Sequence, residues 1–166
     1  MIPDSYFKFK EFAIKNSDAA LKVNFDAVLL GAWVSINDAK SILDIGTGNG
    51  VIALMLNQKQ PGAYITAIEI DEASFKEARF NVNYNSKSDR IKIEHIALQE
   101  FNHSELFDHI VCNPPFYQGD TLAKNYKQKI SKHGFALTYV DLIYFSHKLM
   151  TATGKLSVIL PVIESY

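Results

Sequence analysis

Alternating glycines after an apolar run form the part of this sequence best suited to binding a small ligand. The run from Ser41 to Ile45 contains one carboxylate, Asp44, and the sequence Gly-Thr-Gly-Asn-Gly follows it at positions 46–50. This pattern is typical of a buried parallel strand that leads through a tight turn into a helix, a junction where open α/β sheets bind nucleotide-like ligands. Glycines in the turn adopt backbone angles that a Cβ would forbid, and they let a ligand lie directly on the main chain.

The spacing of the glycines distinguishes between possible ligands. Dinucleotide-binding loops follow Gly-x-Gly-x-x-Gly and place phosphates at a helix N-terminus. Here Gly46, Gly48 and Gly50 alternate, Val51 occupies the place of the third dinucleotide glycine, and no Gly-Lys-Ser/Thr follows as in a P-loop. An ordinary strand-to-helix turn is the simpler alternative, but it does not need three alternating glycines. The pattern therefore favours a ligand-binding loop.

A second carboxylate stands where a ribose would need it. Tyr64 to Ile70 reads as a strand, with Glu69 near its carboxyl end. In nucleotide-binding α/β units, a carboxylate roughly 20 residues beyond the glycines accepts hydrogen bonds from ribose hydroxyls. The alternative is a surface glutamate at a strand end. With the glycine loop upstream, we favour the ribose role.

The sequence Asn113-Pro114-Pro115-Phe116 follows an expected strand at 107–112 and could hold an amino group. Prolines donate no N–H and fix φ near −65°, and a residue before proline is held extended. The side-chain oxygen of Asn113 and the carbonyl of Pro114 then form a rigid pair of acceptors. A simple turn after a strand is the alternative reading.

Such a pair of acceptors suits the activation of an adenine amine, whose lone pair is delocalised into the ring. Acceptors outside the ring plane favour a pyramidal nitrogen that attacks a sulfonium methyl in line, and positioning of this kind supplies several kcal/mol. Phe116 offers a stacking face worth ~1–3 kcal/mol per base. A base inside a helix would first have to be flipped out. This chemistry requires no metal and no general base.

The remaining sequence predicts the elements that position these motifs. Strands alternate with helices after residue 40, which indicates right-handed βαβ crossovers and a parallel sheet with strand order 3-2-1-4-5. The glycine loop and the end of the fourth strand then lie side by side. The expected strands are 41–45, 64–70, 91–96, 107–112 and 155–161, and the expected helices are 51–58, 72–85 and 138–151, the last stopped by Gly154.

Two further elements are expected before the sheet. Residues 6–23 predict a hairpin or short ribbon with one basic side. Asn24 is suited to cap a helix that runs from Asp26 to Trp33. Because this helix is apolar almost all round, we expect it to be buried.

Composition restricts the class of protein. With 166 residues, 48% of them hydrophobic and 21% charged, the chain is expected to form one domain, or two small ones, with a substantial core. No apolar run approaches the ~20 residues of a membrane helix, and charged residues from Asp4 onward exclude a signal-peptide pattern. The single cysteine, Cys112, excludes an internal disulfide and indicates a reducing, cytoplasmic location. With a net charge of -1, any surface for nucleic acid must be local.

These motifs together resemble known methyltransferases. The glycine loop resembles the first motif of class I S-adenosylmethionine-dependent methyltransferases, and Asn-Pro-Pro-Phe resembles the motif of enzymes that methylate exocyclic amines of adenine or cytosine, or a glutamine amide. The run Lys-Val-x-x-Asp-x-x-Leu-Leu-Gly-Ala-Trp at 22–33 is similar to the opening of the bacterial tRNA1(Val) adenine-37 N6-methyltransferase family. The resemblance covers nearly the whole chain.

The resemblance implies a Rossmann-like α/β sheet and S-adenosylmethionine as cofactor. It implies a tRNA substrate, in which the N6 amine of an adenosine near the anticodon of valine tRNA accepts the methyl group. It implies that the target adenine is held by Asn113, Pro114 and Phe116. The implied cofactor-binding residues are Lys22, Asp26, Asp44, Gly46, Thr47, Gly48, Gly50, Glu69 and Leu98. Leu98 is expected to act through its backbone, because Ala97 stands where many relatives have an acid.

The resemblance also divides the chain. Residues 1–36 are expected to form an N-terminal hairpin and helix that cover the cofactor site, and residues 37–166 a methyltransferase core. The family pattern continues past the fifth strand, so we expect a C-terminally truncated core that lacks the last strand pair of the usual seven. That fifth strand would then be an exposed edge.

A local basic segment follows the Asn-Pro-Pro-Phe motif and is expected to contact RNA phosphates. Its residues are Lys124, Lys127, Lys129, Lys132 and His133. The alternative is a solvated loop without a binding role, since runs of charged residues often form such loops. We expect a tRNA substrate, no membrane association and no obligatory protein partner.

Three alternative functions remain compatible with the sequence. A glutamine-amide methyltransferase would use the same acceptor pair, but the N-terminal resemblance argues against it. A cofactor- or RNA-binding fragment without turnover would bind ligand and transfer no methyl group. A nicotinamide dehydrogenase is less favoured, because Val51 interrupts the dinucleotide pattern.

Overall fold

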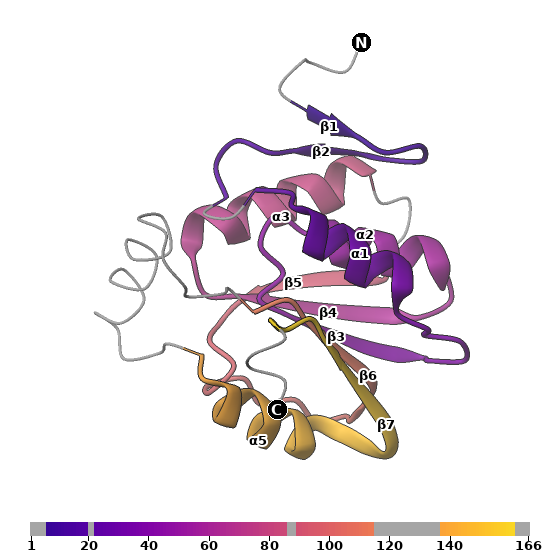
Figure 1. Ribbon diagram of the computed structural model, residues 1–166, viewed down its shortest axis with the longest axis vertical. Coiled ribbons are helices and arrows are strands. Elements are labelled where there is room, and N and C mark those ends of the chain that lie inside the picture. Colours follow the sequence, from indigo (N-terminus) through magenta and orange to yellow (C-terminus); the bar gives the residue numbers. More distant parts are fainter. Residues whose placement is uncertain (1–5, 20–21, 86–88, 115–136, 162–166) are drawn as a thin grey trace.

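Five parallel strands form the central sheet of the protein, in the order β5-β4-β3-β6-β7 (Figure 1). The structure is a computed structural model, and it describes residues 6–19, 22–85, 89–114 and 137–161. The sheet strands are β3 (Ser41–Ile45), β4 (Tyr64–Glu69), β5 (Ile91–His95), β6 (Phe107–Cys112) and β7 (Met150–Val158). The helices are α1 (Phe25–Trp33), α2 (Val51–Lys59), α3 (Glu72–Asn85) and α5 (Tyr139–Leu149), and a separate hairpin consists of β1 (Tyr6–Lys8) and β2 (Ala13–Lys15).

The strand order predicted from the sequence is confirmed. Taken along the chain, the sheet strands are β3, β4, β5, β6 and β7, so the spatial order reads 3-2-1-4-5. In the parallel register, Ile45 at the end of β3 pairs with Cys112 at the end of β6. The glycine loop and Asn113 therefore leave the sheet from neighbouring strand ends.

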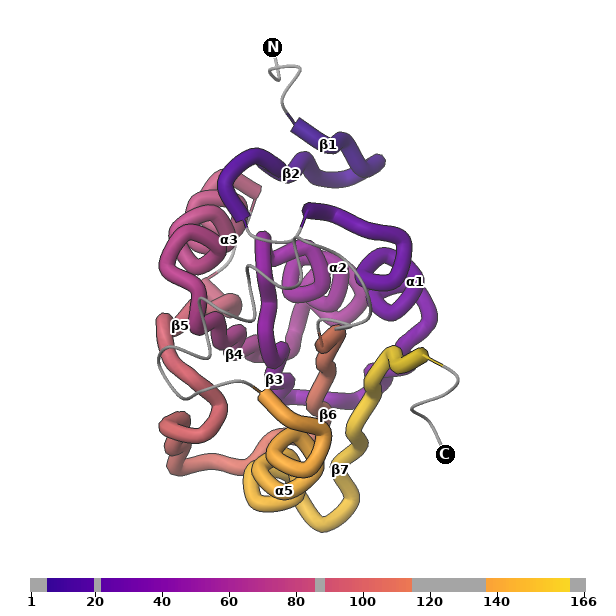
Figure 2. Tube along the Cα trace, turned by 60° about the vertical axis from the view of Figure 1, so that its left-hand side comes forward, coloured from indigo at the N-terminus to yellow at the C-terminus, as the bar shows by residue number. Residues whose placement is uncertain are grey.

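The sheet separates two hydrophobic clusters, as its alternating side chains require. Helices α1, α2 and α3 lie on one face of the sheet and α5 on the other (Figures 1 and 2). Ile42 of β3 points into the cluster under α1 and α2, together with Leu30 and Leu56. Its neighbour Leu43 points into the cluster under α5, together with Leu149. Strand β3 is thus buried on both sides, which explains why its side chains are mostly apolar on both faces.

Helix α1 begins at its predicted cap, but it is not buried all round. The side chain of Asn24 accepts a hydrogen bond of 2.8 Å from the amide of Ala27. The buried residues of α1 are Ala27, Leu30 and Gly31, which face the rest of the protein. Phe25, Leu29 and Trp33 are 76%, 44% and 72% exposed. The prediction of a fully buried helix is wrong because residues four apart share one face, and this face lies opposite the packed one.

The last helix ends earlier than predicted, and Gly154 does not stop it. Helix α5 ends at Leu149, and β7 begins directly at Met150. The pairing of β7 with β6 is irregular, because Met150 pairs with Phe107 but Lys155 already pairs with His109. Gly154 lies inside this irregular stretch, where a Cβ would come within 3.0 Å of the Phe107 carbonyl oxygen and would collide with Met150. The glycine therefore serves a tight bend within the strand.

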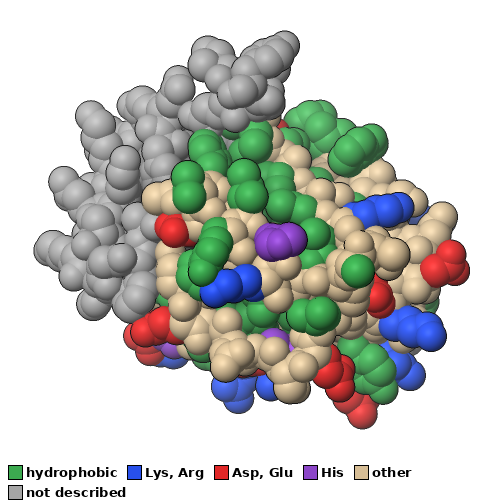
Figure 3. Space-filling model, turned by 90° about the horizontal axis from the view of Figure 1, so that it is seen from below, with side chains coloured by type: hydrophobic (Ala, Val, Ile, Leu, Met, Phe, Trp, Pro, Cys, Tyr) green, Lys and Arg blue, Asp and Glu red, His purple; other side chains and the backbone are tan. Residues whose placement is uncertain are grey.

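Hydrophobic side chains also reach the surface on the α5 side of the sheet (Figure 3). Val140, Ile143 and Tyr144 of α5 are 77%, 63% and 53% exposed, whereas Leu142 and Leu149 are buried. Within the described ranges, no helix is long and apolar enough to cross a membrane.

A capping box formed by Thr138 and Asp141 begins helix α5. The amide of Asp141 donates to Oγ1 of Thr138 at 3.0 Å, and the amide of Thr138 donates to Oδ2 of Asp141 at 3.3 Å. We expect Thr138→Ala to lower the free energy of unfolding by about 1 kcal/mol, because the first turn of the helix loses its side-chain acceptor. Urea denaturation followed by circular dichroism measures the change. Ser104→Ala, at an exposed bend, is the control and should leave the midpoint unchanged.

Candidate functional site

The glycine loop between β3 and α2 adopts backbone conformations that only glycine takes easily. Gly46, Gly48 and Gly50 have φ angles of 68°, 60° and 85°. A Cβ built on Gly46 or Gly48 would meet no atom of the described residues within 4 Å, so this part of the structure leaves the main chain there open. A Cβ on Gly50 would lie 3.4 Å from the Cα of Ala78 in α3. Two glycines thus leave room beside the loop, and the third lets the loop pack on a helix.

The loop is tied to the next strand of the sheet by its own backbone. The amides of Gly46 and Thr47 both donate to the carbonyl of Ile68 in β4, at 2.9 and 3.1 Å. The amide of Gly50 donates to the carbonyl of Thr47 at 2.9 Å, which closes a turn. The loop therefore holds its shape at the carboxyl ends of β3 and β4, where α/β sheets bind ligands.

Asp44 is fully buried directly beneath this loop. Its Oδ2 accepts a hydrogen bond of 2.6 Å from Oγ1 of Thr47. Its Oδ1 is buried and has no hydrogen-bond partner among the described residues. Burial raises the pKa of Asp44 to about 7, and the charge of Glu69 adds to this rise, whereas the hydrogen bond from Thr47 and the main-chain amide of Ala53 oppose it. An unpartnered buried oxygen costs free energy and is suited to receive a donor from a ligand.

Glu69 ends β4 and holds the loop through its carboxylate. Its Oε2 accepts a hydrogen bond of 2.9 Å from the amide of Gly48, and its Oε1 accepts bonds of 2.8 Å from the amides of Ile70 and Asp71. Burial raises the pKa of Glu69, while the bonds from the three amides favour the ionised form. A carboxylate offers about four acceptor positions, so about one remains for a hydroxyl group.

The end of β6 brings the second predicted motif close to the first. Asn113 is half-buried and Pro114 is buried, next to the strand end that pairs with β3. Pro115 and Phe116 lie outside the described residues. The predicted RNA-binding residues Lys124, Lys127, Lys129, Lys132 and His133 also lie outside them.

The other predicted cofactor residues lie at the periphery of this arrangement. Lys22 is exposed, and its Nζ donates to the carbonyl of Ser17. Asp26 is half-buried in the first turn of α1. Leu98 is buried in the cluster that contains Ile68. Its segment lies near the end of β4, because the amide of Ile96 donates to the carbonyl of Glu69 at 3.1 Å.

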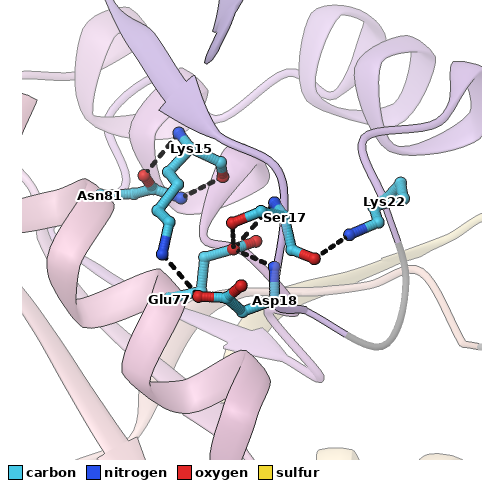
Figure 4. A network of polar contacts seen from close by, with 6 residues as sticks. All are labelled: Lys15, Ser17, Asp18, Lys22, Glu77 and Asn81. Atoms are coloured by element: carbon cyan, nitrogen blue, oxygen red, sulfur yellow. Dashed lines mark hydrogen bonds and ion pairs between the residues drawn. The ribbon is translucent and has the colours of Figure 1, made fainter. Parts of the chain in front are cut away.

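Sequence reasoning missed a polar network that joins the N-terminal segment to α3 (Figure 4). Glu77, Asn81 and Asn85 lie four residues apart along one face of α3, and the first two are 2% and 0% exposed. Such spacing of polar residues usually marks a solvated helix face. The sequence did offer one signal, which is that two of these residues are asparagines. Asparagine is a poor helix former, and neither packing nor solvation alone would favour it inside a helix.

Each of these side chains binds main-chain groups of residues 13–18. Oε2 of Glu77 accepts bonds from the amides of Ser17 and Asp18, at 3.0 and 2.5 Å. The Asn81 amide accepts from the Lys15 N–H at 2.8 Å and donates to the Lys15 carbonyl at 3.0 Å. Surface ion pairs such as Lys15–Asp18 lie beside these contacts and contribute little to stability by themselves.

Asn85 repeats the same pair of bonds one helical turn further on. Its Oδ1 accepts from the N–H of Ala13 at 2.9 Å, and its Nδ2 donates to the carbonyl of Ala13 at 2.6 Å. Asn16 then connects the N-terminal segment to the glycine loop, because its Oδ1 accepts from Nδ2 of Asn49 at 3.2 Å. The hairpin, α3 and the loop are thus one connected unit.

Comparison with known proteins places this fold and site in a class. The family model described as "Methyltransferase small domain" matches residues 18–137. The X-ray structure of YjhP from E. coli has a TM-score of 0.60 at 14% identity, over 85% of this chain and 50% of that one. A SAM-dependent methyltransferase from Thiobacillus denitrificans in complex with S-adenosyl-L-homocysteine has a TM-score of 0.58 at 16% identity, over 86% of this chain and 53% of that one. The protein is therefore a methyltransferase with the Rossmann-like class I fold.

Curated relatives narrow the class to one family. A protein named tRNA1(Val) (adenine(37)-N6)-methyltransferase from Dyadobacter fermentans is 39% identical, over 97% of this chain and 67% of its own length. A protein of the same name from Trichodesmium erythraeum is 42% identical, over 96% of this chain and 69% of its own length. The chain spans about two thirds of the length of these relatives. It belongs to the tRNA1(Val) (adenine(37)-N6)-methyltransferase family.

The raised pKa of Asp44 predicts how stability depends on pH. Below about pH 4 the carboxyl is protonated in both the folded and the unfolded chain, so it adds no pH dependence to the free energy of unfolding. Between the ordinary aspartate pKa of 3.8 and about 7, the unfolded chain releases the proton while the folded chain retains it, so the free energy of unfolding falls as pH rises. The loss is at most roughly 4 kcal/mol.

The variant Asp44→Asn removes this titration and should flatten the decline in stability between pH 4 and 7. Denaturant unfolding of the ligand-free protein at several pH values measures it. Asp89→Asn, at an exposed position, is the control and should keep the wild-type profile. An unchanged slope in Asp44→Asn would mean that the carboxyl is ionised in the fold.

Proposed function

We propose that the protein transfers a methyl group from S-adenosylmethionine to the N6 amine of an adenosine in tRNA. One observation carries the proposal: the open glycine loop and the Asn113-Pro114 pair leave the sheet from the paired ends of β3 and β6. A cofactor on the loop and an amine at the acceptor pair would then face each other. The names of the curated relatives indicate the base, adenosine 37 of a valine tRNA.

The residues present fit the proposed cofactor. Gly46 and Gly48 leave the main chain accessible, because no atom in the described part of the chain lies within 4 Å of either hypothetical Cβ. Glu69 keeps about one acceptor position for a ribose hydroxyl. Oδ1 of Asp44, which has no hydrogen-bond partner in the part of the chain that the structure describes, offers a further acceptor beside Thr47. By the family resemblance, Gly50, Lys22, Asp26 and Leu98 complete the proposed cofactor site.

The chemistry assigned to this chain is positioning. S-adenosylmethionine supplies an electrophilic methyl group on a sulfonium, so the chain needs no metal and no general base. The side-chain oxygen of Asn113 and the carbonyl of Pro114 accept the two N–H bonds of the amine and hold its lone pair toward the methyl carbon. The N–C bond forms as the C–S bond breaks, and the surplus proton leaves to solvent. Phe116, by resemblance, stacks on the base.

The same proposal includes the roles of the two parts of the chain, the cellular location of the enzyme and its partners. Residues 1–36 cover the cofactor site, and residues 37–166 form the core that carries the chemistry. The enzyme acts in the cytoplasm on its tRNA and needs no obligatory protein partner. The basic segment that contains Lys124 contacts RNA phosphates.

A methyl-transfer assay with labelled S-adenosylmethionine tests the reaction. Unmodified tRNA should accept label at adenine N6, and Asn113→Ala should lower kcat by at least ~100-fold, because one preorganised contact to the reacting amine is lost. Affinity for S-adenosylhomocysteine should change less than ~3-fold, since the loop is untouched. Asn37→Ala, exposed before the start of β3, is the control. Label in protein glutamine instead of tRNA would contradict the proposal.

Calorimetric titration with S-adenosylhomocysteine tests the binding loop separately. Gly48→Ala should weaken binding about tenfold, because a Cβ at φ 60° strains the loop and occupies the open space beside it. Gly62→Ala is a matched control, since a Cβ there also meets no atom of the described ranges within 4 Å but its φ is not positive. Equal binding by both variants would place the cofactor elsewhere, and tight binding of NADH by the wild type would favour a dehydrogenase.

A further inference from the structure

The polar face of α3 matches the spacing of an extended strand. Residues four apart in a helix are separated by about 6 Å along the axis. Residues two apart in a strand are separated by about 6.6 Å. Successive turns of α3 therefore bind alternate residues of the strand. Asn85 binds Ala13 and Asn81 binds Lys15. One turn earlier, Glu77 binds Ser17. The side chains of α3 take the place that a neighbouring strand would have.

Among these three residues, Asn81 alone also reaches the glycine loop through its side chain. Its Nδ2 donates to the main-chain carbonyl of Asn49 at 2.9 Å, in addition to the Lys15 carbonyl. The other side of the same peptide group is also fixed, because the amide of Gly50 donates to the carbonyl of Thr47 at 2.9 Å. The peptide between Asn49 and Gly50 is thus held at both ends.

The N-terminal strand orients the Asn81 amide for this contact. The Lys15 N–H donates to Oδ1 of Asn81, which requires Nδ2 to be the atom that faces the carbonyls of Lys15 and Asn49. The carbonyl of Asn49 favours the same orientation, because it accepts only from Nδ2, so the main-chain groups of Lys15 and Asn49 fix the amide together. The contact is completely buried, since Asn81 is 0% exposed. Water therefore does not replace a lost bond at this site without rearrangement.

We propose that Asn81 is a positioning residue for the cofactor, which preorganises the glycine loop and makes its shape dependent on the N-terminal strand. The inference rests on the proposed function, because it assigns the loop to S-adenosylmethionine. Loop glycines have many conformations to lose on binding. A loop already fixed at the Asn49 peptide loses fewer of them, so it binds the cofactor more tightly.

The pair Asn81→Asp and Asn85→Asp tests the inference with matched chemistry. Both substitutions leave an acceptor for the β2 amide, and both remove donors to a β2 carbonyl. Only Asn81→Asp also removes the donor to the Asn49 carbonyl. We expect Asn81→Asp to raise the Kd for S-adenosylhomocysteine and the KM for S-adenosylmethionine about tenfold, with kcat at saturating cofactor within ~2-fold of wild type. Asn85→Asp should change each value less than ~3-fold.

Hydrogen exchange of the ligand-free protein gives a readout that does not depend on the cofactor. The amides of residues 47–51 should exchange about tenfold faster in Asn81→Asp than in Asn85→Asp. Equal loop exchange in the two variants, or equal Kd values, would overturn the inference. If the buried carboxylate prevents folding, the pair Asn81→Ala and Asn85→Ala supplies the same comparison. A wild-type protein that fails to bind S-adenosylhomocysteine would contradict the proposed function, while the exchange comparison would still decide the role of Asn81.

Discussion

The buried amide of Asn81 joins parts of the chain that are far apart in sequence. It bonds to both main-chain groups of Lys15 and to the carbonyl of Asn49, and it lies in the middle of α3. A buried polar group of this kind is costly unless every bond is made. The hairpin, α3 and the glycine loop must therefore be correctly placed together, and an error in one of them leaves the other two with unpaired groups.

The carboxylates at the end of the sheet impose a second constraint. Asp44 and Glu69 are both fully buried beside the loop, and burial raises the pKa of each. Two buried carboxylates at neighbouring strand ends destabilise the fold. In α/β proteins, buried ionisable groups with this free-energy cost are concentrated at binding sites. The hydrogen bonds from Thr47 and Gly48 to these groups show how the loop offsets part of that cost. The same side chains thus shape the loop and remain able to accept bonds from a ligand.

Much of the sheet could be predicted from sequence because its information is local. Strand β3 is mostly apolar and ends at a glycine loop, and β6 is followed by Asn113 and two prolines, so their limits followed from patterns within a few residues. The glycine loop was recognisable from spacing alone. The exposed face of α1 and the bend at Gly154 were not predictable, because they depend on which partners lie across the fold. The α3 network was missed for the same reason, since polar residues at helical spacing usually mark a solvated face and the choice of asparagine is only a weak sign of specific hydrogen bonds.

The contacts of α3 with the hairpin also affect how copies of the protein behave toward one another. A two-stranded hairpin is marginally stable in water, and its outer edge presents unpaired N–H and C=O groups that can recruit a strand from another molecule. In β2, the outward main-chain groups of Ala13 and Lys15 are already satisfied by the two asparagine amides. A helix side chain cannot extend a sheet, so this edge is closed to intermolecular strand pairing. The asparagines of α3 thereby protect the folded protein against aggregation through β2.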